Sequence, residues 1–309
     1  MALIFDIKRF AINDGPGIRT TIFMKGCPLR CRWCHNPEGL RSEAQQLFTR
    51  KKCIKCGTCI GLSPEDAANE CPTCARQISG KEWPMDELMG VIEKERKVME
   101  DSKGGVTISG GEPMMHPEYL MELLIELGKR GFHRCVDTTL FTDSHWVETV
   151  GKECELFLVD LKMMTSERHK QYTGVANEQI LKNIRLVADM GHPYWIRIPM
   201  IEGVNTDDEN INASAEFLSS LKTKPEHINL LPYHNIGLGK IEKIEKASLS
   251  TVNGQEPSAK RQGLCGEATT EWFKEFAAPT EERQQEILNI FSELIFCCFQ
   301  VTFSKKNGK

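Results

Sequence analysis

The chain has 309 residues, 40% of them hydrophobic, and is long enough to bury a large core in one domain with an elaboration. Its formal net charge of −4 gives no support for a nucleic-acid-binding protein. Asp6 comes too early for a signal peptide, and the apolar stretch 294–299 is far shorter than the about 20 residues of a membrane span. We therefore expect a cytoplasmic protein that binds neither membrane nor nucleic acid.

Thirteen cysteines are a high number for a reducing compartment, where disulfides are rare. Eight of them lie between Cys27 and Cys74 and are interpreted first as metal ligands. The other five are scattered and are expected to be small core or surface thiols: Cys135, Cys154, Cys265, Cys297 and Cys298.

The first cysteine group follows residues 21–24, an apolar run that predicts a buried strand. Cys27, Cys31 and Cys34 form the pattern C-x3-C-x2-C in a segment whose two prolines favour a loop. An iron–sulfur cube held by three cysteines keeps one iron free of protein, and that iron can hold a substrate. A zinc site would instead need a fourth ligand, for which His35 is the only neighbour.

The second cysteine group comprises Cys53, Cys56, Cys59 and Cys71. The first three have the spacing of bacterial ferredoxin ligands, and a Cys-Pro pair as fourth ligand also fits that pattern. In a bacterial ferredoxin motif, about three residues separate the third and fourth cysteines. Here eleven residues separate Cys59 from Cys71. With Cys74 spare, at most one cube fits, so we expect a ferredoxin-like insert over residues 50–80. A zinc site made by the same four cysteines is the alternative.

From residue 81 onward, helical and extended patterns alternate. Apolar stripes predict helices near 85–92, 120–127, 180–188 and 211–218, and apolar runs predict strands at 106–108, 134–136, 156–159, 194–198 and 228–231. Repeated βα units imply a parallel sheet with right-handed crossovers. A full barrel has about eight strands in about 250 residues, and only six strong strands are present. The expected fold is therefore α/β, a partial (β/α)6 TIM-like barrel with a small Cys-rich, ferredoxin-like insertion.

The barrel is expected to span residues 1–235, interrupted by the insert, with 236–309 as a C-terminal extension. Residues 237–266 are polar and lack a clear periodicity, which predicts a long flexible segment. Beyond it, the pattern predicts a helix over 281–294 and a closing strand at 301–303.

Reactive or polar residues follow nearly every predicted strand. They are the first cysteine loop, Gly110-Gly111-Glu112, Asp137-Thr138, Asp160 with Lys162, and His234. Since catalytic groups of barrels gather at the C-terminal ends of the strands, we expect one shared site. A polar residue at any single strand end can be explained by the solvation of loops. Solvation explains less well why four of the six strand ends carry a carboxylate or a set of cysteines.

These motifs together resemble one known family. The three-cysteine pattern with Trp33 before the last cysteine resembles the signature of radical S-adenosylmethionine (SAM) enzymes. The flanking DGPGIRT (14–20) and HNPE (35–38) narrow the resemblance to the glycyl-radical-enzyme activating enzymes, the family of pyruvate formate-lyase-activating enzyme. The resemblance covers roughly residues 1–235. It implies a partial barrel whose Cys27, Cys31 and Cys34 hold a SAM-binding [4Fe–4S] cluster.

The resemblance also implies roles for the strand-end residues. The GGE motif, Gly110, Gly111 and Glu112, receives the SAM amino group through its backbone and carboxylate. Asp137, Thr138 and Asp160 help to bind a monovalent cation beside the SAM carboxylate. Lys162, Arg197 and His234 face SAM or the incoming loop of the partner.

For some of these residues, physical arguments support the implied role or leave an alternative to it. Two neighbouring buried carboxylates raise each other's pKa, and a bound cation would keep both ionised. Arg197 lies in an apolar strand and needs an anionic partner, either the SAM carboxylate or an internal salt bridge. Trp33 packs near the adenine or shields the cluster, or is a core tryptophan. The glycine-rich loop before Arg19 is expected near a partner or cofactor.

The activity implied is reductive cleavage of SAM to methionine and a 5′-deoxyadenosyl radical, which installs a glycyl radical on a partner glycyl radical enzyme under anaerobic conditions. A flavodoxin or ferredoxin-type protein would donate the electron, and the second [4Fe–4S] cluster would relay electrons or help to dock a partner. One alternative is a radical SAM enzyme acting on a small molecule, peptide or RNA. Another is an electron-transfer or zinc-binding module without catalysis.

Overall fold

The structure is a computed structural model that describes residues 2–249, 276–294 and 300–303. Its main sheet has eight strands in the order β1-β2-β5-β6-β7-β8-β9-β10. The strands are β1 (Ile4–Ala11), β2 (Arg19–Met24), β5 (Gly105–Gly110), β6 (Arg134–Thr138), β7 (Leu156–Asp160), β8 (Tyr194–Met200), β9 (His227–Pro232) and β10 (Gln300–Phe303). β1 is antiparallel to β2, and all other neighbours are parallel. The expected six-stranded partial barrel, β2 to β9, is thus confirmed, with one strand added at each edge.

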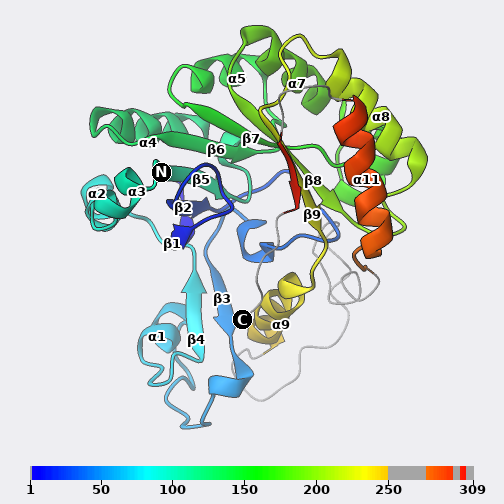
Figure 1. Ribbon diagram of the computed structural model, residues 1–309. Helices are drawn as coiled ribbons and strands as arrows, with labels where there is room; N and C mark the ends of the chain where they lie inside the picture. Colours follow the sequence, from blue (N-terminus) through cyan, green and yellow to red (C-terminus); the bar gives the residue numbers. More distant parts are fainter. Residues whose placement is uncertain (1, 250–275, 295–299, 304–309) are drawn as a thin grey trace.

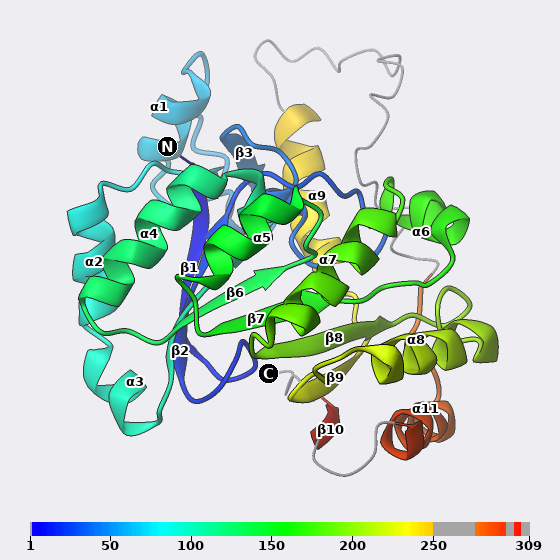
Figure 2. The same ribbon diagram turned by 90° about the horizontal axis from the view of Figure 1, so that it is seen from above.

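Helices connect the parallel strands and cover the outer face of the sheet (Figures 1 and 2). They are α2 (Met85–Glu93), α3 (Arg96–Asp101), α4 (Pro117–Lys129), α5 (Ser144–Gly151), α6 (Ser166–Thr173), α7 (Glu178–Met190) and α8 (Asp208–Ser220). In α7, Ile180, Ile184 and Val187 are buried on one face, and Gly191 ends the helix with a positive φ of 68°. Burial of each such side chain stabilises the fold by about 1.5–3 kcal/mol. None of the described helices is long and apolar enough to cross a membrane.

The cysteine-rich segment between β2 and β5 forms a separate unit that projects away from the main sheet (Figure 1). It contains β3 (Gln45–Phe48), the short 3-10 helix η2 (Arg50–Lys52), α1 (Pro64–Asn69) and β4 (Arg76–Ser79). β3 and β4 pair as an antiparallel two-stranded sheet. Ser63 begins α1, its Oγ accepting a hydrogen bond from the Asp66 backbone N–H at 3.1 Å.

Lys25 joins this unit to the barrel at the end of β2. The side chain is completely buried, and its Nζ donates to the Glu38 carbonyl at 2.6 Å and to Gln45 Oε1 at 3.1 Å. The lysine stem fills the space beside Gly80, where a Cβ atom would overlap it. Burial lowers the pKa of Lys25 to about 8, although nearby Glu38 acts in the opposite direction.

The C-terminal extension differs in part from the expected flexible segment. Helix α9 (Ile236–Leu249) occupies its beginning and packs against β3 and the 3-10 helix η1 (Pro37–Gly39). Ile241 is buried, and Lys240 Nζ forms an ion pair with Glu38 Oε1 at 2.8 Å. The prediction was wrong here because these tertiary contacts stabilise a helix whose glycines weaken its intrinsic propensity. The rest of that segment, 250–266, lies outside the described residues.

The end of the described chain follows the sequence pattern closely. Helix α11 (Glu281–Leu294) packs against α8 and completely buries Ile287 and Phe291. Strand β10 extends the sheet beyond β9, so the expected closing strand is present. In the described part of the chain, β1 and β10 are the two edges of the sheet and do not pair with each other. The barrel is therefore open on that side.

Lys25 gives the fold a testable pH dependence. Its folded-state pKa of about 8 lies below the ordinary value of 10.5, so between these values the unfolded chain binds more protons. The free energy of unfolding should rise with pH across this window. The Lys25→Met variant lacks this pH-dependent contribution. The free energies of unfolding of wild type and variant, plotted against pH, should therefore diverge by about 1–3 kcal/mol across the window. Urea unfolding followed by circular dichroism measures it, with the exposed Lys182→Met as control. Parallel curves for wild type and Lys25→Met would contradict the assignment.

Candidate active site

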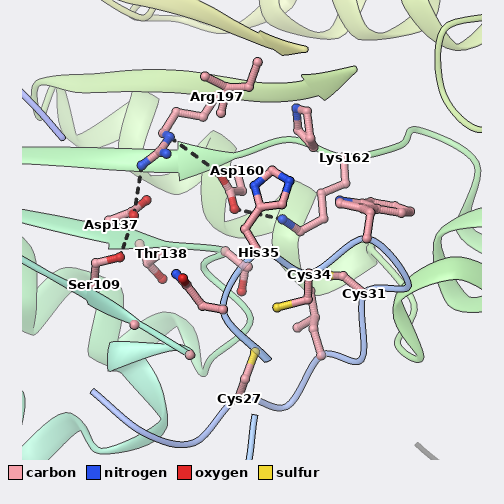
Figure 3. A pocket seen from close by; sticks show the side chains of 18 of the residues that line it. Cys27, Cys31, Cys34, His35, Ser109, Asp137, Thr138, Asp160, Lys162 and Arg197 are labelled. Atoms are coloured by element: carbon pink, nitrogen blue, oxygen red, sulfur yellow. Dashed lines mark hydrogen bonds and ion pairs between the residues drawn. The ribbon is translucent and has the colours of Figure 1, made fainter. Parts of the chain in front are cut away.

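A cavity of about 190 Å³ opens at the C-terminal ends of the parallel strands (Figure 3). Twelve of the thirteen residues predicted for the first cluster and SAM line it: Cys27, Cys31, Trp33, Cys34, Gly110, Gly111, Asp137, Thr138, Asp160, Lys162, Arg197 and His234. They come from the loop after β2, from the ends of β5, β6, β7 and β9, and from the middle of β8. The parallel arrangement therefore brings together residues that lie up to 207 positions apart in the sequence.

Backbone hydrogen bonds fix the first cysteine loop on two sides. On one side, Cys27 N–H donates to the Leu40 carbonyl at 3.2 Å. On the other, Arg30 N–H donates to the Thr173 carbonyl at 2.6 Å, at the end of α6. The three cysteine side chains thus approach the cavity from a loop held between η1 and α6.

Burial raises the pKa of all three thiols. The pKa of Cys27 lies well above its usual range, and that of Cys34 is raised to about 12, in each case first by desolvation and then by the Cys31 thiol. The nearby Lys162 ammonium partly offsets this for Cys31. Because metal ligation requires thiolates, a cationic centre and Lys162 would together stabilise the charged form of these cysteines.

The arrangement of the thiols bears on the kind of centre that fits. A single zinc ion needs every ligand sulfur at about 2.3 Å from one point. Within the described residues, no group of three His, Cys, Asp or Glu side chains is arranged around a single ion. Ligands of an iron–sulfur cube bind separate irons and do not share one point. Three thiols that line one cavity match the three-cysteine donor set of such a cube.

Four charged side chains, one buried (Lys162) and three half-buried, form a chain across the cavity wall (Figure 3). Arg197 Nη1 lies 2.9 Å from Asp137 Oδ2, and its Nε lies 4.0 Å from Asp160 Oδ1. Lys162 Nζ lies 2.8 Å from the other oxygen of Asp160. Ser109 Oγ donates to Asp137 at 2.7 Å. Arg197 thus forms an internal salt bridge, one of the two partners that the sequence left open, and its contact with the SAM carboxylate stays a prediction.

The two carboxylates differ in acidity. Burial raises the pKa of Asp137, and Arg197 offsets only part of this. Burial acts on Asp160 in the same sense, but Lys162 and Arg197 outweigh it and hold the pKa of Asp160 below its usual range. Protein cations already supply much of the positive charge near these carboxylates. The monovalent cation stays a prediction.

Glu112 is the predicted SAM contact that does not line the cavity. Its carboxylate, 1% exposed, turns inward and accepts hydrogen bonds from Thr138 Oγ at 2.6 Å, from Thr139 N–H at 2.7 Å and from Thr139 Oγ at 2.5 Å. The Met114 N–H adds a fourth at 3.1 Å. The carboxylate therefore holds the end of β6 against the end of β5, whereas Gly110 and Gly111 present backbone to the cavity.

Trp33 and two histidine rings line part of the cavity. Trp33 is buried against Met163, Ile201, Val204 and Tyr233, so it is a core residue that also lines the cavity. His35 stacks on His234, with ring centroids 3.8 Å apart and planes inclined by 15°. The sequence gave no indication of this stacking, because the two residues are 199 positions apart.

The loop before β2 enters the site differently from the expectation. Arg19 is fully buried and donates to Thr107 Oγ at 2.6 Å and to the Val106 carbonyl at 2.7 Å, so it fastens β2 to β5 and does not line the cavity. Asn13, which the sequence did not single out, does line it. No periodicity or motif spacing marked Asn13.

The second group of cysteines lines a separate cavity of about 240 Å³ in the projecting unit. Cys53, Cys56, Cys59 and Cys71 contribute to it, and the exposed Cys74 does not. A hydrogen bond from Thr58 Oγ at 3.3 Å lowers the pKa of Cys56. The four thiols chosen from their spacing thus share one space.

Comparison with known proteins agrees with this fold and site. Residues 21–215 match the radical SAM superfamily. The chain is 36% identical to the trans-4-hydroxy-L-proline dehydratase activating enzyme of Clostridioides difficile, over 94% of this chain and 95% of that protein. It is 35% identical to the choline trimethylamine-lyase activating enzyme of Oleidesulfovibrio alaskensis, over 79% and 87% respectively. A crystal structure of a domain of pyruvate-formate lyase-activating enzyme from Bacteroides vulgatus is 41% identical, covers 65% of this chain and 99% of that domain, and has a TM-score of 0.50.

A partial barrel with three cysteines at the mouth of its strands defines a radical SAM enzyme, a class that carries a [4Fe–4S] cluster and uses SAM. The curated relatives, which this chain matches over most of their length, are activating enzymes. The chain belongs to the glycyl-radical-enzyme activating enzymes of the radical SAM superfamily. It is an oxidoreductase that activates a partner enzyme, and the alternatives of a non-catalytic module or another radical SAM substrate are set aside.

The position of Glu112 generates a prediction about SAM. Glu112→Gln replaces one acceptor oxygen by an NH₂ group that faces donors of Thr138 or Thr139, at a cost of about 1–3 kcal/mol. The displaced β6 end should weaken SAM binding about tenfold. Titration of the reduced protein with SAM, followed by electron paramagnetic resonance (EPR), measures this. The exposed Glu118→Gln is the matched control. Equal SAM affinity in both variants would show that Glu112 does not position the site.

Proposed function

We propose that the cavity at the strand ends holds both cofactors, with Cys27, Cys31 and Cys34 as ligands of the [4Fe–4S] cluster and SAM in the remaining space. The observation that carries this is the convergence of three thiols, the GGE backbone and four paired charges on one cavity. When bound, the cofactors supply reductive cleavage of SAM to methionine and a 5′-deoxyadenosyl radical, which removes a hydrogen atom from a glycine of the partner.

The protein residues then position the reactants and keep water out. Gly110 and Gly111 offer backbone groups to the SAM amino group, and side chains there are excluded because a Cβ on Gly111 would overlap the carbonyls of Gly26 and Gly39. Arg197 attracts the SAM carboxylate while Asp137 and Asp160 balance its charge. A monovalent cation beside these two aspartates and Thr138 would join this balance.

Lys162 and the aromatic wall complete the arrangement. Lys162 is held by Asp160, which raises the pKa of the lysine against the effect of burial, so it stays charged beside the cysteines. Its charge favours the thiolate forms that bind the cluster. Trp33 and the stacked pair of His35 and His234 cover the end where the partner's glycine would enter.

We further propose a second [4Fe–4S] cluster on Cys53, Cys56, Cys59 and Cys71, supported by their shared cavity. A flavodoxin or ferredoxin-type protein is the electron donor, and the enzyme works in the cytoplasm. The relatives activate different partners, and their identities to this chain lie within 33–37%. The particular glycyl radical enzyme is therefore a matter for experiment.

The activity is tested by forming the radical on a candidate partner. The reduced enzyme with SAM should produce a glycyl EPR signal on trans-4-hydroxy-L-proline dehydratase or on choline trimethylamine-lyase. Cys31→Ala should abolish the signal by removing a cluster ligand, whereas Cys154→Ala, a buried thiol outside the cavity, should retain it. An undiminished signal from Cys31→Ala would overturn the ligand assignment.

The second cluster is tested by counting iron. Anaerobically purified Cys53→Ala/Cys56→Ala should contain about four fewer irons per chain than wild type, the content of one cube. Its absorbance near the visible iron–sulfur band should fall in proportion. Cys74→Ala is the matched control, because Cys74 does not line the cavity and should leave the iron count unchanged. If the double variant keeps all its iron, the projecting unit holds no cluster.

A further inference from the structure

Basic side chains gather on one part of the projecting unit. Arg50, Lys51, Lys52 and Lys55 are all exposed, and two exposed apolar side chains accompany them. These are Ile54, 65% exposed, and Ile60, 82% exposed. We call these six residues the basic surface.

The charge of the basic surface contrasts with the rest of the chain. Residues 50–80 contain five Lys and Arg against three Asp and Glu, whereas the whole chain has 39 against 43. The three acidic residues of the unit, Glu65, Asp66 and Glu70, all lie on α1 or at its end. Residues 50–60 carry no acidic side chain. Within the unit, positive charge is thus concentrated in residues 50–60 and negative charge in residues 65–70.

Half of the basic surface lines the four-cysteine cavity. Ile54, Lys55 and Ile60 line that cavity together with the cysteines, and Cys56 is itself exposed. A cluster held there would lie at the molecular surface, within reach of a docked protein. The unit also projects from the barrel, so a partner can approach it without covering the strand ends (Figure 1).

Rigid contacts connect the unit to the loop of the first cluster. Lys25 bonds at once to Glu38, in η1, and to Gln45, at the start of β3. On the other side of β3, α9 packs against both β3 and η1, and Lys240 Nζ also donates to Asn36 Oδ1 at 2.9 Å. The two cysteine-bearing segments therefore keep a fixed relation to each other.

We propose that the basic surface docks an acidic electron-carrier protein of the flavodoxin or ferredoxin class. This inference rests on the proposed function, which requires a one-electron donor. Complementary charge accelerates and orients such encounters, and Ile54 and Ile60 provide an apolar centre within the charged rim. The glycyl radical partner must instead deliver a glycine to the strand-end cavity. Nucleic acid is disfavoured because no aromatic side chains alternate with the basic ones.

Charge reversal tests the docking. Arg50→Glu/Lys51→Glu/Lys52→Glu, three residues that do not line the four-cysteine cavity, should weaken binding of a flavodoxin of net negative charge about tenfold or more at low salt, measured by isothermal titration calorimetry on the anaerobic holoenzyme. Wild-type affinity should fall steeply with added salt, and that of the variant should hardly change. The control is Lys129→Glu/Lys170→Glu/Lys182→Glu, which reverses three exposed lysines on α4, α6 and α7. Equal affinities in the two triple variants would overturn the proposal.

The choice of reductant distinguishes an electron carrier from the glycyl radical enzyme as the partner of the basic surface. With titanium(III) citrate as chemical reductant, the basic-surface variant should form the glycyl radical at the wild-type rate, and with flavodoxin it should be slower. Loss of activity with both reductants, together with weaker binding of the glycyl radical enzyme, would assign the surface to that partner and overturn the proposal. Binding of single-stranded RNA in place of flavodoxin would overturn it as well. Absence of a glycyl signal from wild type with titanium(III) would sink the proposed function, while the calorimetry would still report on docking.

Discussion

The pairing of Arg197 with Asp137 and Asp160, extended by Lys162, is the interaction on which the active site depends. Isolated charges in this position would be expelled or neutralised, because desolvation costs several kcal/mol per ion. Linked as they are, on or directly after three adjacent strands, β6, β7 and β8, the cations Arg197 and Lys162 have raised pKa values and the carboxyl group of Asp160 has a lowered one. The cavity wall is therefore polar, and Lys162 lies near enough to the cysteines to offset part of the rise that burial causes in the pKa of Cys31. If the cofactors bind there, as proposed, little reorganisation of the wall would be needed.

The need to satisfy a buried charged group also explains the position of Glu112. A carboxylate that is 1% exposed needs its acceptor capacity filled, and four donors from two strand ends fill it. The GGE sequence thus has two functions, since its glycines present backbone to the cavity and its glutamate fixes the neighbouring threonines. Substitution of the glutamate would remove the hydrogen bond that positions Thr138 in the cavity, although Glu112 itself does not line the cavity.

The two proposals put electron entry and radical chemistry at different places. Radical chemistry is proposed for the strand-end cavity and electron entry for the projecting unit, which has a basic, partly apolar surface. Lys25 and α9 hold the two regions together through β3 and η1. This separation would allow a small electron carrier and a large glycyl radical enzyme to bind at the same time. It also gives the C-terminal extension a structural task at its beginning.

The sequence by itself determined the barrel, its open form and the location of the site, because βα periodicity and strand-end residues are local signals. Cys27, Cys31, Cys34 and the two aspartates could be placed at one shared site in that way, and their roles there stay predictions. Only the tertiary structure decided that Arg197 pairs with Asp137, that Glu112 turns away from the cavity and that α9 is a helix. Side-chain direction at a strand end depends on partners more than 20 residues away, such as Thr138 for Glu112. The stability of α9 depends on burial of Ile241 against a distant segment, and no pattern within residues 236–249 encodes that neighbour.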